Sequence, residues 1–306
     1  MSEILYDNEQ KIRRKQMIIK AVVYLLLTAF AIFIVVPFYW MILTSLKTDG
    51  TGMGGVFRVP PELWLRPSQW ELNNYVLVLR GEVPYGRYML NTVLVSAIST
   101  AGTVLTTILA SFAFARLNFR GRDVFFMMLI ATMMIPGEMF VITNFMTFSE
   151  RGLGWVGRHQ TYWQAVGAMT LPFMTSIFYI FFLRQTFKQV PNELYYAAKV
   201  DGTSDFMYLW KIMVPIAKPT IITITILNAM GTWNAFIWPQ LITQFNDSYR
   251  LVSNGLRGAS YVDESGRILY NEQMAAAFVV TVPLLIVFLL LKKYIMRGVS
   301  RSGIKG

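Results

Sequence analysis

AVVYLLLTAFAIFIVVPFYWMILTSL, the sequence of residues 21–46, contains no charged side chain. A helix needs about 20 consecutive, mainly apolar residues to cross a bilayer, and this stretch exceeds that length. Because the bilayer core offers no water to backbone N–H and C=O groups, a helix is the structure that satisfies them within one segment. The stretch is too long for the core of a signal peptide, and no small-residue cleavage site follows it. The sequence therefore predicts a retained membrane-spanning helix.

Similar runs recur along the chain, and the one charge within them is Glu138. Hydrophobic residues make up 55% of the sequence, above the roughly 45–50% of soluble domains. We therefore predict an all-α integral membrane protein with one permease domain, residues 21–291, between tails at residues 1–20 and 292–306. The six predicted spans cover residues 21–45, 88–115, 124–148, 162–183, 212–242 and 273–292.

The formal net charge of +11 is unevenly distributed over the predicted loops. If the spans alternate from a cytoplasmic start, the entire excess lies on the face that carries both tails and the segment at residues 184–218. Cytoplasmic loops are enriched in Lys and Arg, so we predict a multi-pass protein of the bacterial cytoplasmic (inner) membrane with both termini in the cytoplasm. A nucleic-acid partner is not expected, because its surface would interleave basic residues with exposed aromatic ones.

Residue types that carry catalysis or bind metals are scarce. The chain has no cysteine and one histidine, His159, which excludes thiol nucleophiles and cysteine-ligated metals. The sequence also shows no paired carboxylates and no activated nucleophile. We therefore predict that this chain has no catalytic residue, metal site or cofactor, and that His159 is an ordinary interfacial histidine.

One predicted cytoplasmic segment, VPNELYYAAKVDGTSDFMYLWKIMVPIAKP at residues 190–219, has helix signals of its own. Pro191 suits the first turn of a helix, where a missing N–H costs nothing. Gly202 suits a left-handed helix stop, and Thr203 or Ser204 can cap a second short helix. The segment therefore predicts a helix, a sharp turn and another helix on the cytoplasmic face.

The same segment resembles the Glu-Ala-Ala loop of permeases in ATP-binding-cassette (ABC) importers. Ala197 and Ala198 are followed, at the spacing of that pattern, by Gly202, Ile212 and Pro215. The resemblance implies a coupling helix that docks in a groove of an ATPase and moves with it. A plain amphipathic helix that touches only lipid head groups is the alternative.

Two positions depart from the family pattern: Tyr196 replaces its Glu, and Val214 replaces its Leu. A change from Leu to Val is tolerated in volume, whereas the loss of the acid removes a charge that could meet a basic group of the partner. The residues implied in ATPase coupling are Glu193, Tyr195, Tyr196, Ala197, Ala198, Asp201, Gly202, Phe206, Ile212 and Pro215.

Four other passages resemble the permeases of carbohydrate importers: residues 37–48, 116–123, 231–239 and 297–306. The resemblance implies the type I ABC importer permease fold and a non-catalytic subunit that forms half of the path for a sugar or oligosaccharide. It also implies a second homologous permease, two cytoplasmic ATPase subunits that hold ATP and Mg, and an extracytoplasmic solute-binding protein. Candidate contacts with the binding protein are Asp247, Arg250, Arg257 and Asp263.

Polar side chains within spans are costly, which makes them candidates for the substrate path. An indole can stack on a sugar ring, and an amide can bind its hydroxyls. Two alternatives stay open: a structural bend at Glu138, and packing of the span-five residues against the partner permease. The candidates are Glu138, Asn144, Asn228, Trp233 and Asn234.

The alternative function is a secondary transporter driven by an ion gradient. Such proteins usually need intramembrane acids and an internal inverted repeat. One intramembrane Glu and the lack of a visible repeat argue against that alternative.

Overall fold

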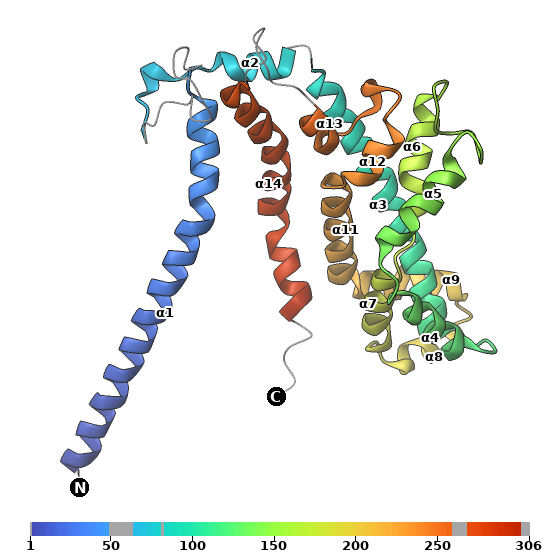
Figure 1. The fold of residues 1–306 in the computed structure, drawn as a ribbon. Coiled ribbons are helices and arrows are strands. Elements are labelled where there is room, and N and C mark those ends of the chain that lie inside the picture. The colour runs from blue at the N-terminus through green and yellow to red at the C-terminus, as the bar shows by residue number, and fades with distance from the viewer. Residues whose placement is uncertain (1, 49–63, 81–82, 259–267, 301–306) are drawn as a thin grey trace. The chain divides into compact units, whose positions relative to one another are not determined.

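The computed structural model describes residues 2–48, 64–80, 83–258 and 268–300 (Figure 1). Within these ranges the protein is helical and has no strand, only an isolated β-bridge between Ser149 and Val156. The predicted all-α fold is therefore confirmed. The chain divides into two compact units, Met1–Val78 with Tyr261–Val279 and Leu79–Ser260 with Val280–Gly306.

The first unit contains a long apolar helix and a small polar cluster. Its elements are α1 (Ser2–Ser45), η1 (Pro67–Gln69), most of α2 (Asn73–Arg80) and the start of α14 (Tyr270–Ser300). Asn74 of α2 donates hydrogen bonds of 2.9 Å to the carbonyls of Ser45 and Lys47 and accepts one of 3.0 Å from Asn271. One buried amide thus joins the end of α1 to α2 and α14.

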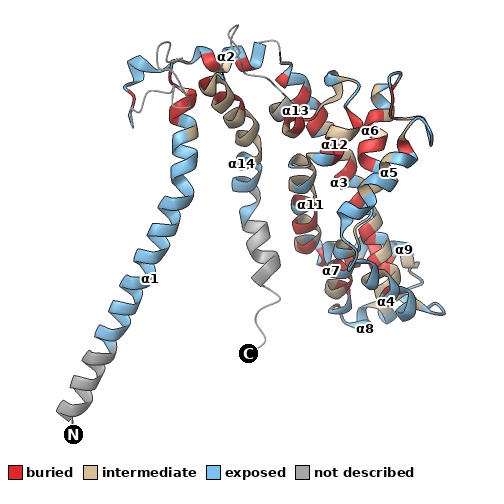
Figure 2. Ribbon diagram, viewed as in Figure 1, coloured by how far each residue is buried: buried red, intermediate tan, exposed pale blue. Residues whose placement is uncertain are grey.

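The second unit is built around α3 (Tyr85–Arg116), which packs against α7 and α11. Small residues with hydroxyl groups are buried along α3, and Figure 2 colours buried residues red. Thr103 and Ser111 donate to the carbonyls of Phe173 and Ile180 at 3.0 and 2.9 Å. Small residues let helix backbones approach closely inside a membrane, which explains the tight packing of this unit.

The other elements of the second unit follow in chain order. They are α4 (Arg122–Thr132), η2 (Gly137–Met139), α5 (Phe140–Phe148), α6 (Tyr162–Thr170), η3 (Leu171–Phe173), α7 (Ile177–Lys188), α8 (Asn192–Val200), α9 (Asp205–Tyr208), η4 (Leu209–Met213), α10 (Val214–Ile216), α11 (Lys218–Trp233), α12 (Ile237–Ile242), η5 (Asp247–Tyr249), α13 (Val252–Gly258) and the rest of α14. Figure 1 shows α8 and α9 at the end of this unit away from α12 and α13.

Three described helices are long and apolar enough to cross a membrane, and three bent helix pairs raise the number to six if each pair is one span. The continuous helices are Arg13–Ser45, Tyr85–Arg116 and Tyr270–Leu290. The pairs are Arg122–Thr132 with Gly137–Phe148, Tyr162–Phe173 with Ile177–Lys188, and Asp205–Ile216 with Lys218–Trp233, bent by 80°, 53° and 80°. The predicted spans 124–148, 162–183 and 212–242 are therefore interrupted helices. Each break lies close to a proline, which lacks the N–H that continues a helix.

Candidate functional site

The segment between α7 and α11 forms the helix–turn–helix that the sequence predicts. Helix α8 begins at Asn192 with Pro191 as its N-cap, one position earlier than the first-turn placement expected for this proline. Gly202 adopts a left-handed φ of +70°, and the Thr203 N–H bonds the Ala198 carbonyl at 2.8 Å, as in a helix-ending Schellman motif. The Ser204 hydroxyl then accepts a hydrogen bond from the backbone of α9.

The two short helices are fastened to each other through Asp205. Its carboxylate accepts a 2.7 Å hydrogen bond from the Tyr195 hydroxyl and pairs with the Lys199 ammonium at 2.8 Å. The Tyr195 ring packs edge-on against Tyr208, with ring centroids 5.1 Å apart. Ala198 is buried beneath these contacts. The face of α8 that carries Tyr195, Ala198 and Lys199 therefore holds the two helices of the hairpin together.

The outer face of α8 is free of contacts with the described core. Glu193, Tyr196, Ala197 and Val200 are exposed, and their i, i+3, i+4, i+7 spacing places them on one face of the helix. The exposed fractions reach 64% for Tyr196 and 88% for Val200. We call these four residues the α8 stripe. Three of the four are uncharged, and Tyr196 and Val200 are exposed hydrophobic side chains.

The structure divides the residues implied in coupling into two groups. Exposed ones are Glu193, Tyr196, Ala197, Asp201, Gly202, Phe206 and Pro215. Ala198 is buried, whereas Tyr195 and Ile212 are partly buried against the hydrophobic core. The buried and partly buried residues support the hairpin, and the exposed residues form its surface.

Arg116, at the end of α3, joins the start of α8 to the central helix. Its guanidinium donates to the carbonyls of Phe187 and Val190 and to the Asn192 side chain, the first of these at 2.8 Å. Below this contact, buried residues of α3, α7, α8 and α9 form one hydrophobic cluster. A displacement of α8 would therefore be transmitted to the helices of the core.

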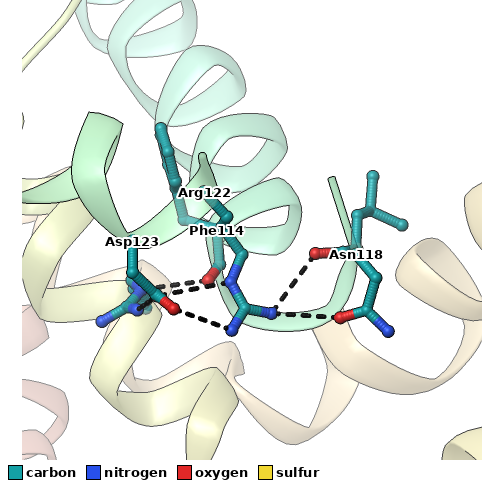
Figure 3. Close-up of polar contacts among 6 residues, drawn as sticks. Phe114, Asn118, Arg122 and Asp123 are labelled. Carbon is teal, nitrogen blue, oxygen red and sulfur yellow. Dashed lines mark hydrogen bonds and ion pairs between the residues drawn. The ribbon is translucent and has the colours of Figure 1, made fainter. Parts of the chain in front are cut away.

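A second polar contact connects the α3–α4 turn to α7 (Figure 3). Asp123 pairs with Arg122 at 3.3 Å and with Arg184 at 3.4 Å. Arg184 is buried, donates to the Phe114 carbonyl at 3.1 Å, and lies 3.7 Å from the centroid of the Phe126 ring. The pair of Arg184 and Asp123 was not predicted, because the two residues are 61 positions apart in the chain and no local pattern links them.

A cavity of about 660 Å³ lies within the second unit, among α3, the η2–α5 turn, α6, α11 and α12. Its walls are mainly apolar, with a few polar groups, as is usual for ligand sites. Glu138, Asn228 and Asn234 line the cavity, whereas Asn144 and Trp233 are not among its lining residues. Asn228 donates to the Thr100 hydroxyl at 3.2 Å.

Trp238 also lines this cavity, although it is not among the residues predicted for the substrate path. Its indole is buried and donates to the Ala168 carbonyl at 3.0 Å. The signal that could have identified Trp238 is its position in GTWNAFIWP, residues 231–239, which drew attention to Trp233 instead.

The segment before α14 is held firmly on the start of α3. Asp247 and Arg250 form an ion pair of 2.7 Å, and Asn91 donates to the carbonyls of Ser248 and Arg250 at 3.0 Å each. Of the other predicted binding-protein contacts, Arg257 belongs to α13, and Asp263 lies outside the described residues. Among the residues that the structure describes, no group of three or more His, Cys, Asp or Glu could hold a metal.

Comparisons with known proteins place this geometry in context. Residues 102–301 match the family described as binding-protein-dependent transport system inner membrane component. The chain is 29% identical to the trehalose/maltose transport system permease protein MalG of Thermococcus litoralis, covering 97% of this chain and 99% of that protein. It is 26% identical to the arabinooligosaccharides transport system permease protein AraQ of Bacillus subtilis, covering 88% and 90%.

The fold has a counterpart of known structure. It is similar to a chain in the crystal structure of a bacterial ABC transporter involved in the import of the acidic polysaccharide alginate, with a TM-score of 0.76 and 23% identity over 92% of this chain and 98% of that chain. The expected fold of an ABC importer permease is therefore present.

Proposed function

Because the chain belongs to the family of binding-protein-dependent transport system inner membrane components, we propose that it is the permease subunit of an ABC importer for a sugar or oligosaccharide. The relatives transport trehalose or maltose and arabinooligosaccharides, according to their names. In this proposal the chain forms half of the translocation path, and a second homologous permease forms the other half.

The observation that carries the proposal is the α8 stripe. Large apolar side chains such as Val200, 88% exposed, favour a protein partner that covers them. An amphipathic helix that lies in a hydrophobic groove is a common mode of recognition. The partner is one of two cytoplasmic ATPase subunits, which hold ATP and Mg and perform the hydrolysis. The bias of basic residues toward this side of the membrane supports the cytoplasmic location of α8 and of both termini.

The fastened hairpin gives the coupling its physical basis. The contacts of Asp205 hold α8 and α9 together, and Arg116 joins them to α3. A rigid attachment is required, because a hairpin that yielded at Gly202 would absorb the motion of the ATPase. Movement of α8 therefore changes the packing of α3 and α11, which line the cavity.

The cavity is our candidate for the substrate path. Its volume of about 660 Å³ lies within the range of small-molecule sites. The amides of Asn228 and Asn234 can bind sugar hydroxyls as donors and acceptors, and the Glu138 carboxylate can accept from them. At the end of the unit away from α8, the ion-paired surface of Asp247 and Arg250 is the proposed contact for the solute-binding protein.

Uptake by the purified complex in vesicles tests this proposal. The complex should consist of this chain, its partner permease, the ATPases and the binding protein. We expect uptake to require ATP on the side of the membrane where the ATPase subunits lie. Uptake should persist when ionophores collapse all ion gradients. A nonhydrolysable ATP analogue is the matched control and should give no uptake. Uptake that follows an ion gradient and ignores ATP would instead support a secondary transporter.

A further inference from the structure

The turn between α3 and α4 forms an open, basic pocket that the transport function does not use. The pocket has a volume of about 540 Å³ and is lined by residues 118–124. Arg120 and Arg122 belong to its lining, and Lys188 at the end of α7 interacts electrostatically with Arg122, Arg184 and Asp123. Asp123 is ion-paired with Arg122 and Arg184 and is the one carboxylate among the residues that line the pocket, so the pocket keeps a surplus of positive charge.

The cations of this pocket retain capacity for another ligand. Arg122 reaches its carbonyl, amide and carboxylate partners only at 3.3–3.4 Å (Figure 3), near the long limit for a hydrogen bond. Arg120 and Lys188 are exposed. Guanidinium groups match the oxygen geometry of a phosphate and bind it with paired hydrogen bonds.

Exposed apolar side chains begin directly beside the basic turn. Val124, Phe125 and Met127 of α4 are 62%, 52% and 71% exposed. Helix α4 starts one of the bent pairs that are long and apolar enough to span a membrane, and in such a span these exposed side chains would face lipid acyl chains. The basic turn then lies at the level of the lipid head groups. A charged head beside an apolar chain is the chemistry of a phospholipid.

We propose that the α3–α4 turn binds the phosphate head group of an anionic phospholipid, with Arg120, Arg122 and Lys188 as its cationic contacts and the exposed face of α4 against its acyl chains. The proposal goes beyond the transport function and requires neither a particular substrate nor a particular ATPase. Basic pockets at the membrane surface attract anionic lipids by about 1 kcal/mol per Lys or Arg.

Lipid association with the full chain tests the site. The chain is reconstituted in phosphatidylcholine vesicles that contain spin-labelled phosphatidylglycerol, and the motionally restricted lipid fraction is measured. The variant R120Q/K188Q changes two exposed residues, so its fold should persist, as circular dichroism can verify. We expect its preference for phosphatidylglycerol over phosphatidylcholine to fall about fivefold for each cation removed. The control R151Q/R158Q removes two exposed arginines from the loop between α5 and α6 and should keep the preference.

Three results would overturn the proposal. One is a parental preference in R120Q/K188Q, and another is an equal loss in R151Q/R158Q, which would indicate general surface charge. The third is displacement of the lipid by inorganic phosphate but not by sodium chloride of the same ionic strength, which would indicate a site for free phosphate. Because the measurement uses no ATP or sugar, its failure would leave the transport proposal unaffected.

Discussion

The hydroxyl of Tyr195 donates a 2.7 Å hydrogen bond to Asp205 across the left-handed turn at Gly202. The same carboxylate pairs with Lys199, so one acid in α9 holds two side chains of α8. This arrangement fixes the angle between the two helices while it leaves the α8 stripe free for a partner. Stiffness and exposure are thus provided by opposite faces of one short helix.

Replacing Asp205 by alanine removes the shared acceptor and should loosen the hairpin. Hydrogen bonds to a charged group contribute about 1.5–3 kcal/mol, whereas solvent screens the exposed ion pair with Lys199 and weakens it. We expect ATP hydrolysis to continue while sugar uptake per ATP falls several-fold. Tyr195→Phe removes one of the two contacts and should show a smaller fall. An unchanged uptake-to-hydrolysis ratio in both variants would contradict the positioning role of Asp205.

The contribution of this contact to uptake per ATP should stay constant between about pH 6 and 8. Hydrogen bonding to Asp205 raises the pKa of Lys199. A raised pKa in the folded protein means that the stabilisation is complete below the ordinary lysine value of about 10.4 and is lost only as the pH rises through the folded value. The measurement is the uptake-to-hydrolysis ratio of the parental complex and of D205A across this range. A ratio that changes in the parental complex but not in D205A would refute the prediction.

Gly202→Val should separate ATP hydrolysis from transport. A side chain at φ +70° costs roughly 1–2 kcal/mol, and a β-branched one is least tolerated there. No atom lies within 4 Å of the position that a Cβ would take, so the effect comes from the backbone alone. Gly86→Val is the matched control, because this site is equally open and lacks a positive φ. Parental transport by G202V would show that the left-handed turn is dispensable.

The turn was predictable because its signals are local. Gly202 and Ser204 act on the backbone within a few residues, so their roles follow from residue type and spacing. The partnership of Arg184 with Asp123 joins residues 61 positions apart, and no periodicity encodes it. The cavity poses the same difficulty: polar residue type selected Asn144 and Asn228 alike, but only the fold places Asn228 on the cavity wall. The bend at Glu138 was anticipated from its place in the sequence, but the bends within the predicted spans 162–183 and 212–242 were missed, because apolar length does not report where a helix breaks.

Val200→Asp should weaken the association with the ATPase while the chain remains folded. The side chain is 88% exposed, so the substitution removes no internal contact, but it would place a charge in the apolar groove of the partner. A charge that is buried without a partner costs about 2 kcal/mol or more, which corresponds to a loss of affinity of at least about tenfold. Val200→Thr keeps the shape and should have a small effect. If the ATPase copurified with V200D at the parental level, the α8 stripe would not be part of the interface.

Asn228→Ala should impair transport more than Asn144→Ala. Both residues lie in predicted spans, but of the two only Asn228 lines the cavity, where its amide could bind a hydroxyl of the sugar in the proposed substrate path. A lost hydrogen bond costs about 1 kcal/mol, so uptake should fall about fivefold at limiting substrate, while ATP hydrolysis stimulated by the binding protein persists. Because Asn228 also donates to Thr100, Thr100→Val provides a control that removes this internal contact alone. If T100V reproduces the whole defect of N228A, the amide acts in packing and the cavity wall is not the substrate path.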